Sequence, residues 1–284
     1  MAIVTVYRNG ATAGMAGRNP SPAKRDVIKG WSSAAVRRHT KWLYSIDAPS
    51  LDGQGYALTL TMRNTPESAE QLHAIRRNWI KRLERMGATR VHWVIEWQKR
   101  GTPHIHAAVY FPDDLESPHE GVSLGTLALV SWLSTVPEEW GAAIHAQHGD
   151  EISGPLGWLK YLSKHASRGV KHYQRMGAPA GWERTGRLWG HTGEWPADEP
   201  MRFDMPREAY WRYRRLVRSW RVADARSSGD RSRIKYARRM LASSDPKLSA
   251  VRGVSDWVPE AVAIEFVALL VAEGFAVQDH EVAA

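Results

Sequence analysis

The sequence contains no cysteine. This absence excludes a disulfide framework and a thiolate-bound zinc site, and it is typical of proteins kept in a reducing compartment. The chain also lacks an uncharged apolar run of about 18 residues, the length that a membrane-spanning helix needs. The apolar run before Tyr7 is too short for a secretory signal. We therefore expect a cytoplasmic protein with no membrane partner.

Acidic residues are comparatively few. Lys and Arg number 39 against 30 Asp and Glu, which gives a formal net charge of +9. A chain this basic predicts a polyanionic partner. Hydrophobic residues make up 43% of the 284 positions, enough for the core of one large domain or of a domain with an appendage. The 14 tryptophans are expected mainly in that core, with some available to stack on bases.

Composition along the chain predicts three regions. Residues 1–30 are rich in Gly, Ala, Pro, Arg and Lys, which is typical of a flexible basic arm. Residues 31–200 contain the motifs whose side chains suggest metal binding and catalysis. Residues 201–284 are expected to form a basic helical C-terminal region. In that last region aromatic residues are interleaved with arginines, a pattern that favours binding to nucleic acid. Our candidate DNA contacts there are Arg212, Arg215 and Arg218.

The most informative stretch covers residues 91–111, VHWVIEWQKRGTPHIHAAVYF. Apolar and polar residues alternate on both sides of a turn that contains Gly and Pro, which predicts a β-hairpin. With no bulge in this hairpin, Glu96 lies opposite His104 or His106 and on the same face of the sheet. The hairpin is therefore expected to bring two imidazoles and one carboxylate within a few ångströms of one another.

Two imidazoles and a carboxylate on a rigid sheet form half of a coordination shell for a divalent ion. A mixed N/O donor set with open positions suits Mg²⁺ or Mn²⁺. The predicted metal ligands are therefore His104, His106 and Glu96. Two alternatives stay open at this point: a His-x-His pair is often an ordinary surface feature, and His145 or His148 could replace Glu96 as the third ligand.

The elements before the hairpin predict the fold class. Residues 56–62 alternate as a strand, and residues 65–86 carry apolar side chains at helical spacing up to Gly87. Strand, helix, strand, strand predicts an α+β fold, an antiparallel β-sheet with flanking helices, which we expect on one face of the sheet. Thr59 and Thr61 lie on the polar face of the first strand, where we attribute them to sheet propensity.

A second motif lies in residues 155–168, PLGWLKYLSKHASR. Tyr161, Lys164, His165 and Arg168 recur at i, i+3, i+4 and i+7 and so share one face of a predicted helix. A phenol ionises near pH ~10, so it would need a neighbouring cation or metal ion to act as a nucleophile. The alternative is an amphipathic basic helix with an ordinary half-buried tyrosine.

Taken in order, the Thr-rich strand, the Gly-Thr-Pro-His-Ile-His segment with its upstream Glu, and the Tyr-x-x-Lys helix resemble the motifs of the HUH endonucleases. Within that group the chain looks most like a rolling-circle replication initiator, and the resemblance covers about residues 30–190. It implies a ferredoxin/RRM-like core, a metal ion at the His pair, Tyr161 as the nucleophile and Lys164 as its positioning partner. Gly157 and His165 occupy the positions of a second tyrosine, so the resemblance is to a single-tyrosine enzyme.

This resemblance implies metal-dependent nicking of single-stranded or extruded origin DNA through a 5′-phosphotyrosine. Nicking would start rolling-circle replication of a plasmid or phage in a bacterial host, with the helicase and polymerase of the host as partners. Arg168 and Lys171, beside the tyrosine, are further candidate DNA contacts. The alternatives are a relaxase or transposase of the same superfamily, a non-catalytic origin-binding protein, and an RNA-binding or RNA-processing protein.

Overall fold

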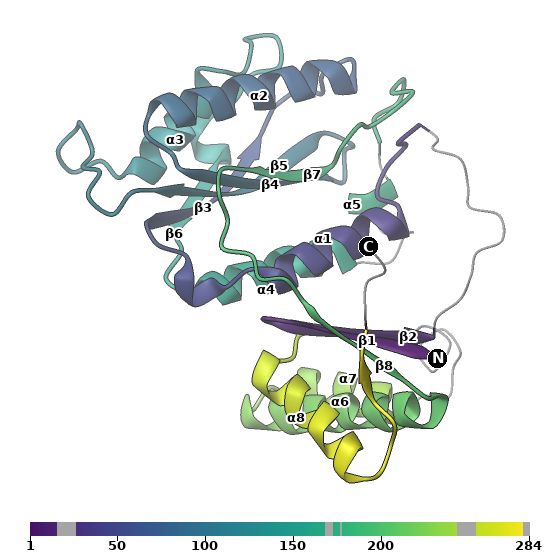
Figure 1. The fold of residues 1–284 in the computed structure, drawn as a ribbon. Helices are drawn as coiled ribbons and strands as arrows, with labels where there is room; N and C mark the ends of the chain where they lie inside the picture. The colour runs from purple at the N-terminus through teal and green to yellow at the C-terminus, as the bar shows by residue number, and fades with distance from the viewer. Residues whose placement is uncertain (16–26, 168–172, 177, 243–253, 281–284) are drawn as a thin grey trace. The chain divides into compact units, whose positions relative to one another are not determined.

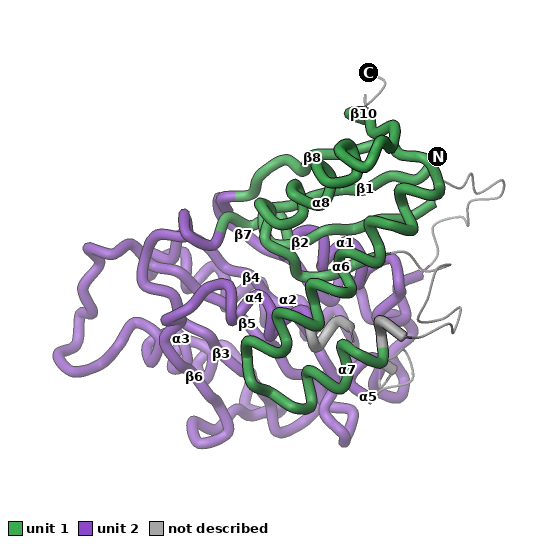
Figure 2. The backbone as a smooth tube through the Cα atoms, turned by 90° about the horizontal axis from the view of Figure 1, so that it is seen from below, with its two compact units in different colours: residues 1–23, 44–47, 197–284 green, residues 24–43, 48–196 purple. Residues whose placement is uncertain are grey.

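The computed structural model of the chain describes residues 1–15, 27–167, 173–176, 178–242 and 254–280. The side chains of residues 164–167, 176 and 240–242 are not described. The chain forms two compact units (Figure 2). Unit 1 comprises Met1–Ala23, Tyr44–Asp47 and Ala197–Ala284, and unit 2 comprises Lys24–Leu43 and Ala48–Pro196. Each unit is built on its own antiparallel sheet.

The sheet of unit 2 has the strand order β6-β3-β5-β4-β7. Its strands are β3 (Gln54–Thr61), β4 (Arg90–Trp97), β5 (Pro103–Phe111), β6 (His148–Glu151) and β7 (Trp189–Thr192). Strands β4 and β5 form the expected hairpin, whose turn passes through Gly101 at a φ of 86°, a conformation that glycine adopts without strain. The register pairs Glu96 with His104 and Thr59 with His106.

Helices cover both faces of this sheet. Helices α2 (Ala69–Arg85) and α3 (Leu124–Leu133) lie on one face, and α1 (Ser33–Ser45), α4 (Pro155–Ser167) and α5 (Tyr173–Met176) lie on the other (Figure 1). The expectation of helices on one face only was wrong. The face that carries Glu96 also carries apolar side chains such as Val94 and Ala108, which are 0% and 1% exposed and needed a cover.

Helix α2 shows how local sequence signals place the elements of unit 2. Ser68 accepts from the backbone of Gln71, whose side chain returns to the backbone of Ser68, so the helix starts at a capping box. It therefore begins four positions after Thr65, where the sequence predicted its start. Gly87 follows its end with a φ of 94°, as expected for a helix terminator. The predicted α+β class, with antiparallel sheet and flanking helices, is confirmed.

Unit 1 has the strand order β10-β8-β1-β2-β9. Its strands are β1 (Ala2–Tyr7), β2 (Gly10–Met15), β8 (Met201–Met205), β9 (Val254–Asp256) and β10 (Gln278–Asp279). Its helices are α6 (Arg207–Ser227), α7 (Arg231–Ala242) and α8 (Glu260–Ala272). Its core joins side chains of β1 to those of α6 and α8, among them Val4, Val6, Tyr210, Tyr213 and Leu270.

The prediction of a flexible basic arm over residues 1–30 is wrong for residues 2–15. Ala2, Val4 and Val6 are each 0% exposed, because every second side chain of β1 packs into the core of unit 1. The partner of β1 is β8, far along the chain, so composition near the N-terminus could not reveal it. Residues 16–26 lie outside the described part of the chain. The predicted C-terminal region, 201–284, contains the expected helices but shares its sheet with this N-terminal hairpin.

No helix in the described parts of the chain is both long enough and apolar enough to cross a membrane.

Candidate active site

Three potential metal ligands converge on one face of the unit 2 sheet. His104 Nε2 and His106 Nε2 are 2.9 Å apart, and they lie 3.6 Å and 3.5 Å from Glu96 Oε2. The cross-strand pair of Glu96 with His104 produces this arrangement, as the hairpin pattern predicted. Among the described residues, these three make the one group of His, Cys, Asp or Glu side chains that meets the geometry of an ion site.

The donor set fits a divalent cation. Adjacent ligands of an octahedral Mg²⁺, each about 2.1 Å from the ion, are about 3 Å apart, and the edges of this triangle are close to that spacing. Glu96 is only 1% exposed. A carboxylate that deep is stable only beside positive charge or strong hydrogen-bond donors. This buried group could therefore bind a metal ion.

Two neighbours orient these ligands. Thr59 Oγ1 on β3 lies 3.1 Å from His106 Nδ1. With Nδ1–H donated to Thr59, the Nε2 atom of His106 keeps the lone pair that faces Glu96. Gln174 on α5, itself 7% exposed, donates its Nε2–H to Glu96 Oε2 at 3.1 Å. Both contacts hold a ligand atom toward the centre of the triangle.

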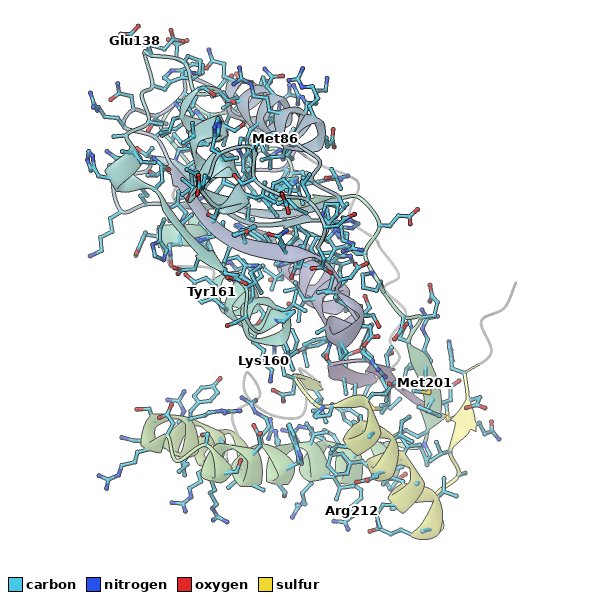
Figure 3. The ribbon with its side chains drawn as sticks, turned by 90° about the vertical axis from the view of Figure 1, so that its left-hand side faces the viewer. Met86, Glu138, Lys160, Tyr161, Met201 and Arg212 are labelled. Atoms are coloured by element: carbon cyan, nitrogen blue, oxygen red, sulfur yellow. The ribbon has the colours of Figure 1, made fainter. Side chains whose placement is uncertain are left out.

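Tyr161 lies beside this group. Helix α4 buries Leu159 and Leu162, which are 2% and 0% exposed, and carries Tyr161 between them in sequence (Figure 3). The Tyr161 ring meets the His106 ring edge-on, with 6.0 Å between centroids, and stacks on Trp158 at 5.3 Å. The side chain remains 40% exposed. The phenol is thus next to the candidate metal ligands and open to a substrate.

Other predicted residues near Tyr161 are only partly described. Lys164 belongs to α4, one helical turn after Tyr161, but its side chain lies outside the described residues. Arg168 and Lys171 lie wholly outside them. The alternative third ligands do not join the group: His145 is exposed in a short 3₁₀ turn, and His148 pairs with Asp150 at 2.8 Å on the edge strand β6.

The three candidate DNA contacts of unit 1 have different surroundings. Arg212 forms a two-pronged contact with Glu273, with its Nε 2.9 Å from Oε2 and its Nη2 2.5 Å from Oε1. Arg218 is only 8% exposed. Arg215 is exposed. Two of the three arginines therefore serve the packing of unit 1 itself.

A buried histidine pair was missed by sequence reasoning. His39 on α1 and His92 on β4 are both 0% exposed, and their Nε2 atoms are 3.1 Å apart. Burial lowers the pKa of His39 to about 3 and holds that of His92 well below its ordinary value. Both rings are neutral at pH 7 and link α1 to the strand that carries Glu96. The sequence did hold one signal for the burial of His39: it lies four residues before the apolar Leu43 and so shares its face of the helix.

Thr59 and Gln174 were also missed as functional neighbours. Thr59 had a signal, because the alternation of its strand placed it on the polar face. Gln174 had none, because α5 is only four residues long and its contact with Glu96 spans a large gap in sequence.

Comparisons with known proteins place the chain in a family. A family profile for replication-associated proteins of the ORF2 type matches residues 55–166, which include Glu96, both site histidines and Tyr161. A candidate replication protein of Xylella fastidiosa strain 9a5c is 46% identical over 98% of this chain and 99% of its own length. A replication-associated protein of Pseudomonas phage Pf3 is 37% identical over 95% of this chain and 97% of its own length. No solved structure matches. The chain belongs to this family of replication-associated proteins.

Proposed function

We propose that this chain is a metal-dependent, single-tyrosine endonuclease and strand transferase of the HUH type, which nicks an origin to initiate rolling-circle replication. The observation that carries the proposal is the position of Tyr161, whose ring lies 6.0 Å from that of His106 within the Glu96–His104–His106 group. A buried histidine pair with a carboxylate suits metal binding alone. An exposed phenol at its edge adds a nucleophile.

The proposed chemistry is a transesterification. The phenolic oxygen of Tyr161 attacks the phosphorus of a single-stranded DNA phosphodiester. A bond forms between that oxygen and phosphorus, and the bond from phosphorus to the 3′ oxygen breaks. The phenolic proton passes to solvent, and the departing 3′ oxygen takes up a proton and becomes a free hydroxyl. The 5′ phosphate stays on Tyr161, so that a later 3′ hydroxyl can displace the tyrosine and reseal the strand without ATP.

Residues around Tyr161 divide the remaining tasks. A divalent ion, Mg²⁺ or Mn²⁺, held by His104, His106 and Glu96 would supply positive charge to the non-bridging oxygens of the phosphate. Trp158 fixes the plane of the Tyr161 ring by stacking on it. Lys164 is proposed to add positive charge near the attacked phosphate, one helical turn from the nucleophile. Arg168 and Lys171 are proposed to hold the neighbouring DNA backbone.

The relatives support a proposal about the cell in which this reaction takes place. Replication-associated relatives from a phage and from Xylella fastidiosa support a role in a bacterial host. We propose that the chain works in the cytoplasm of that host, where its helicase and polymerase extend the free 3′ hydroxyl. The order of the motifs, with the tyrosine after the histidines, favours an initiator over a relaxase.

The decisive experiment looks for the covalent intermediate. Purified protein is incubated with Mn²⁺ and single-stranded fragments that tile the replicon encoding it, and adducts are resolved on a denaturing gel. Wild type should form an adduct that peptide mass spectrometry maps to Tyr161. Tyr161→Phe should form none while binding Mn²⁺ normally, because it loses one oxygen and keeps the ring. Tyr173→Phe is the matched control, since Tyr173 is similarly exposed at 39% and should be dispensable.

Three outcomes would contradict the proposal. A nick made by Tyr161→Phe without an adduct would indicate a hydrolytic nuclease that uses activated water. Full activity of a His104→Ala, His106→Ala double variant would exclude the proposed metal ligands. Binding without any cleavage or adduct, unaffected by metal removal, would indicate a non-catalytic origin-binding protein.

A further inference from the structure

Helix α7 of unit 1 carries five cations and no acid along its length. Arg231, Lys235 and Arg238 recur at i, i+4 and i+7, so they line one side of the helix, and all three are exposed. We call these three residues the α7 stripe. A different side of the helix carries Ile234 and Ala237, which pack against Val222 and Ala225 of α6. The stripe is thus held on a helix that is anchored to the unit.

Three acids of unit 1 pair with arginines outside the stripe. Glu273 pairs with Arg212, Asp256 pairs with Arg221, and Asp224 pairs with Arg233. Across the described residues, no member of the α7 stripe has an ion pair with an acidic side chain. Of the arginines selected on α6, Arg212 is therefore paired within the unit and Arg218 is buried in it, whereas the stripe is exposed and has no such partner in the described part of the chain.

The three like charges of the stripe lower the stability of the helix that carries them. Like charges three or four positions apart repel each other and destabilise a helix. Arg231 lies in the first turn, which itself holds no acid. The carboxylate of Asp230 caps this end of the helix by accepting from the backbone of Ser232 and Arg233. Seven residues of helix span about 10 Å, so the three cations form a short, straight row. A row of unpaired cations on a rigid rod is suited to a regular polyanion.

We infer that the α7 stripe binds the phosphate backbone of duplex DNA, independently of base sequence. This inference rests on the proposed function only in that DNA is the partner. Duplex DNA is the expected form because it carries one charge per about 1.7 Å of axis, twice the charge density of one strand. The stripe would hold the duplex part of an origin while unit 2 acts on a single strand. Arg231, Lys235 and Arg238 thus replace Arg212 and Arg218 as the expected contacts.

The test compares two triple variants with the same loss of charge. R231A/K235A/R238A removes the stripe. The matched control, R77A/K81A/R85A, removes three exposed cations from α2 of unit 2. The affinity of each protein for a 30-base-pair duplex of arbitrary sequence is measured by fluorescence anisotropy between 50 and 200 mM salt. Circular dichroism checks that both variants are folded, and R231K/R238K tests whether charge alone restores binding.

Loss of the stripe should reduce the slope of log affinity against log salt by about 2 to 3, because each lost phosphate contact contributes about 0.9. Affinity near 100 mM salt should fall about tenfold, and the α2 control should stay close to wild type. An unchanged slope in the folded stripe variant would overturn the inference. An equal loss in the α2 control would overturn it too, since net charge would then explain the effect.

A second readout separates this inference from the nicking proposal. Adduct formation on a short single strand should be unchanged in the stripe variant, because Tyr161 belongs to the other unit. If wild type forms no adduct but the stripe variant still loses duplex affinity, the nicking proposal fails and the α7 surface stands. If adducts form normally and the salt slope does not change, the α7 surface fails and the nicking proposal stands.

Discussion

Replacement of Thr59 by Val tests whether the contact between Thr59 and His106 controls the affinity of the candidate metal site. Valine keeps the branched shape of threonine on β3 but removes the oxygen that lies 3.1 Å from His106 Nδ1. His106 is 4% exposed, so water cannot readily take the place of that oxygen. The ring then loses the contact that selects its tautomer and its orientation toward Glu96.

The expected size of the effect follows from this single contact. Loss of a partner behind a metal-binding histidine typically weakens metal affinity 10- to 100-fold, or about 1.4 to 2.7 kcal/mol. The unpaired Nδ1–H should also lower the free energy of unfolding by about 1 to 3 kcal/mol, the usual cost of a buried unsatisfied donor. At a Mn²⁺ concentration 100 times the wild-type Kd, the ion should stabilise wild type by about 2.7 kcal/mol. A variant with 100-fold weaker affinity should gain only about 0.4 kcal/mol.

Mn²⁺ affinity is measured without DNA, from the electron paramagnetic resonance signal of the free ion during titration. Thermal unfolding with and without Mn²⁺ gives a second value that is independent of nicking. Thr61→Val is the control, because Thr61 lies on the same strand, opposite His104, and its hydroxyl contacts Gln98 and the backbone of Met62. Wild-type Mn²⁺ affinity in Thr59→Val, or equal losses in both variants, would refute the proposed role of Thr59.

Two further predictions concern Gln174, which contacts Glu96, and His39, which packs against the strand that carries Glu96. Gln174→Leu removes the amide that donates to Glu96 Oε2 at 3.1 Å. It should raise the Mn²⁺ concentration for half-maximal adduct formation about tenfold and leave the rate at saturating Mn²⁺ nearly unchanged; a loss that saturating metal does not restore would contradict a positioning role. The pKa of about 3 for His39 lies below its unfolded value of 6.5, so the unfolded state takes up the proton first as pH falls. The stability of the wild type should therefore fall between pH 6.5 and 3, by about 3 kcal/mol at pH 4.5 from this ring alone, and His39→Gln should lose that part of the acid dependence in urea unfolding. Parallel pH dependences in the two proteins would show that His39 is not the group responsible.

Local pattern was sufficient for most of unit 2. Alternation over residues 91–111 predicted the hairpin and the pairing of Glu96 with a site histidine, because the side-chain period of a strand leaves few possible registers. Helical spacing over residues 65–86, up to Gly87, predicted the helix that the structure shows as α2, Ala69–Arg85.

Contacts between distant segments could not be predicted in this way. The hairpin of residues 2–15 looked like a mobile arm because its partner strand begins only at Met201. Paired and exposed arginines look alike in sequence, and only the positions of Glu273 and Asp256 show that Arg212 and Arg221 are paired within the unit.

The sequence by itself determined the chemistry available to this protein: a carboxylate and two imidazoles on one face of a hairpin, a tyrosine on a later helix, and a basic surface for a polyanion. These depend on short-range periodicity, which the backbone imposes wherever the chain folds. Tertiary structure alone decided that helices cover both faces of the sheet, that Thr59 contacts His106 and Gln174 contacts Glu96, and that the Tyr161 ring lies 6.0 Å from that of His106. Those outcomes depend on which surfaces pack together, and packing joins residues that no local pattern connects.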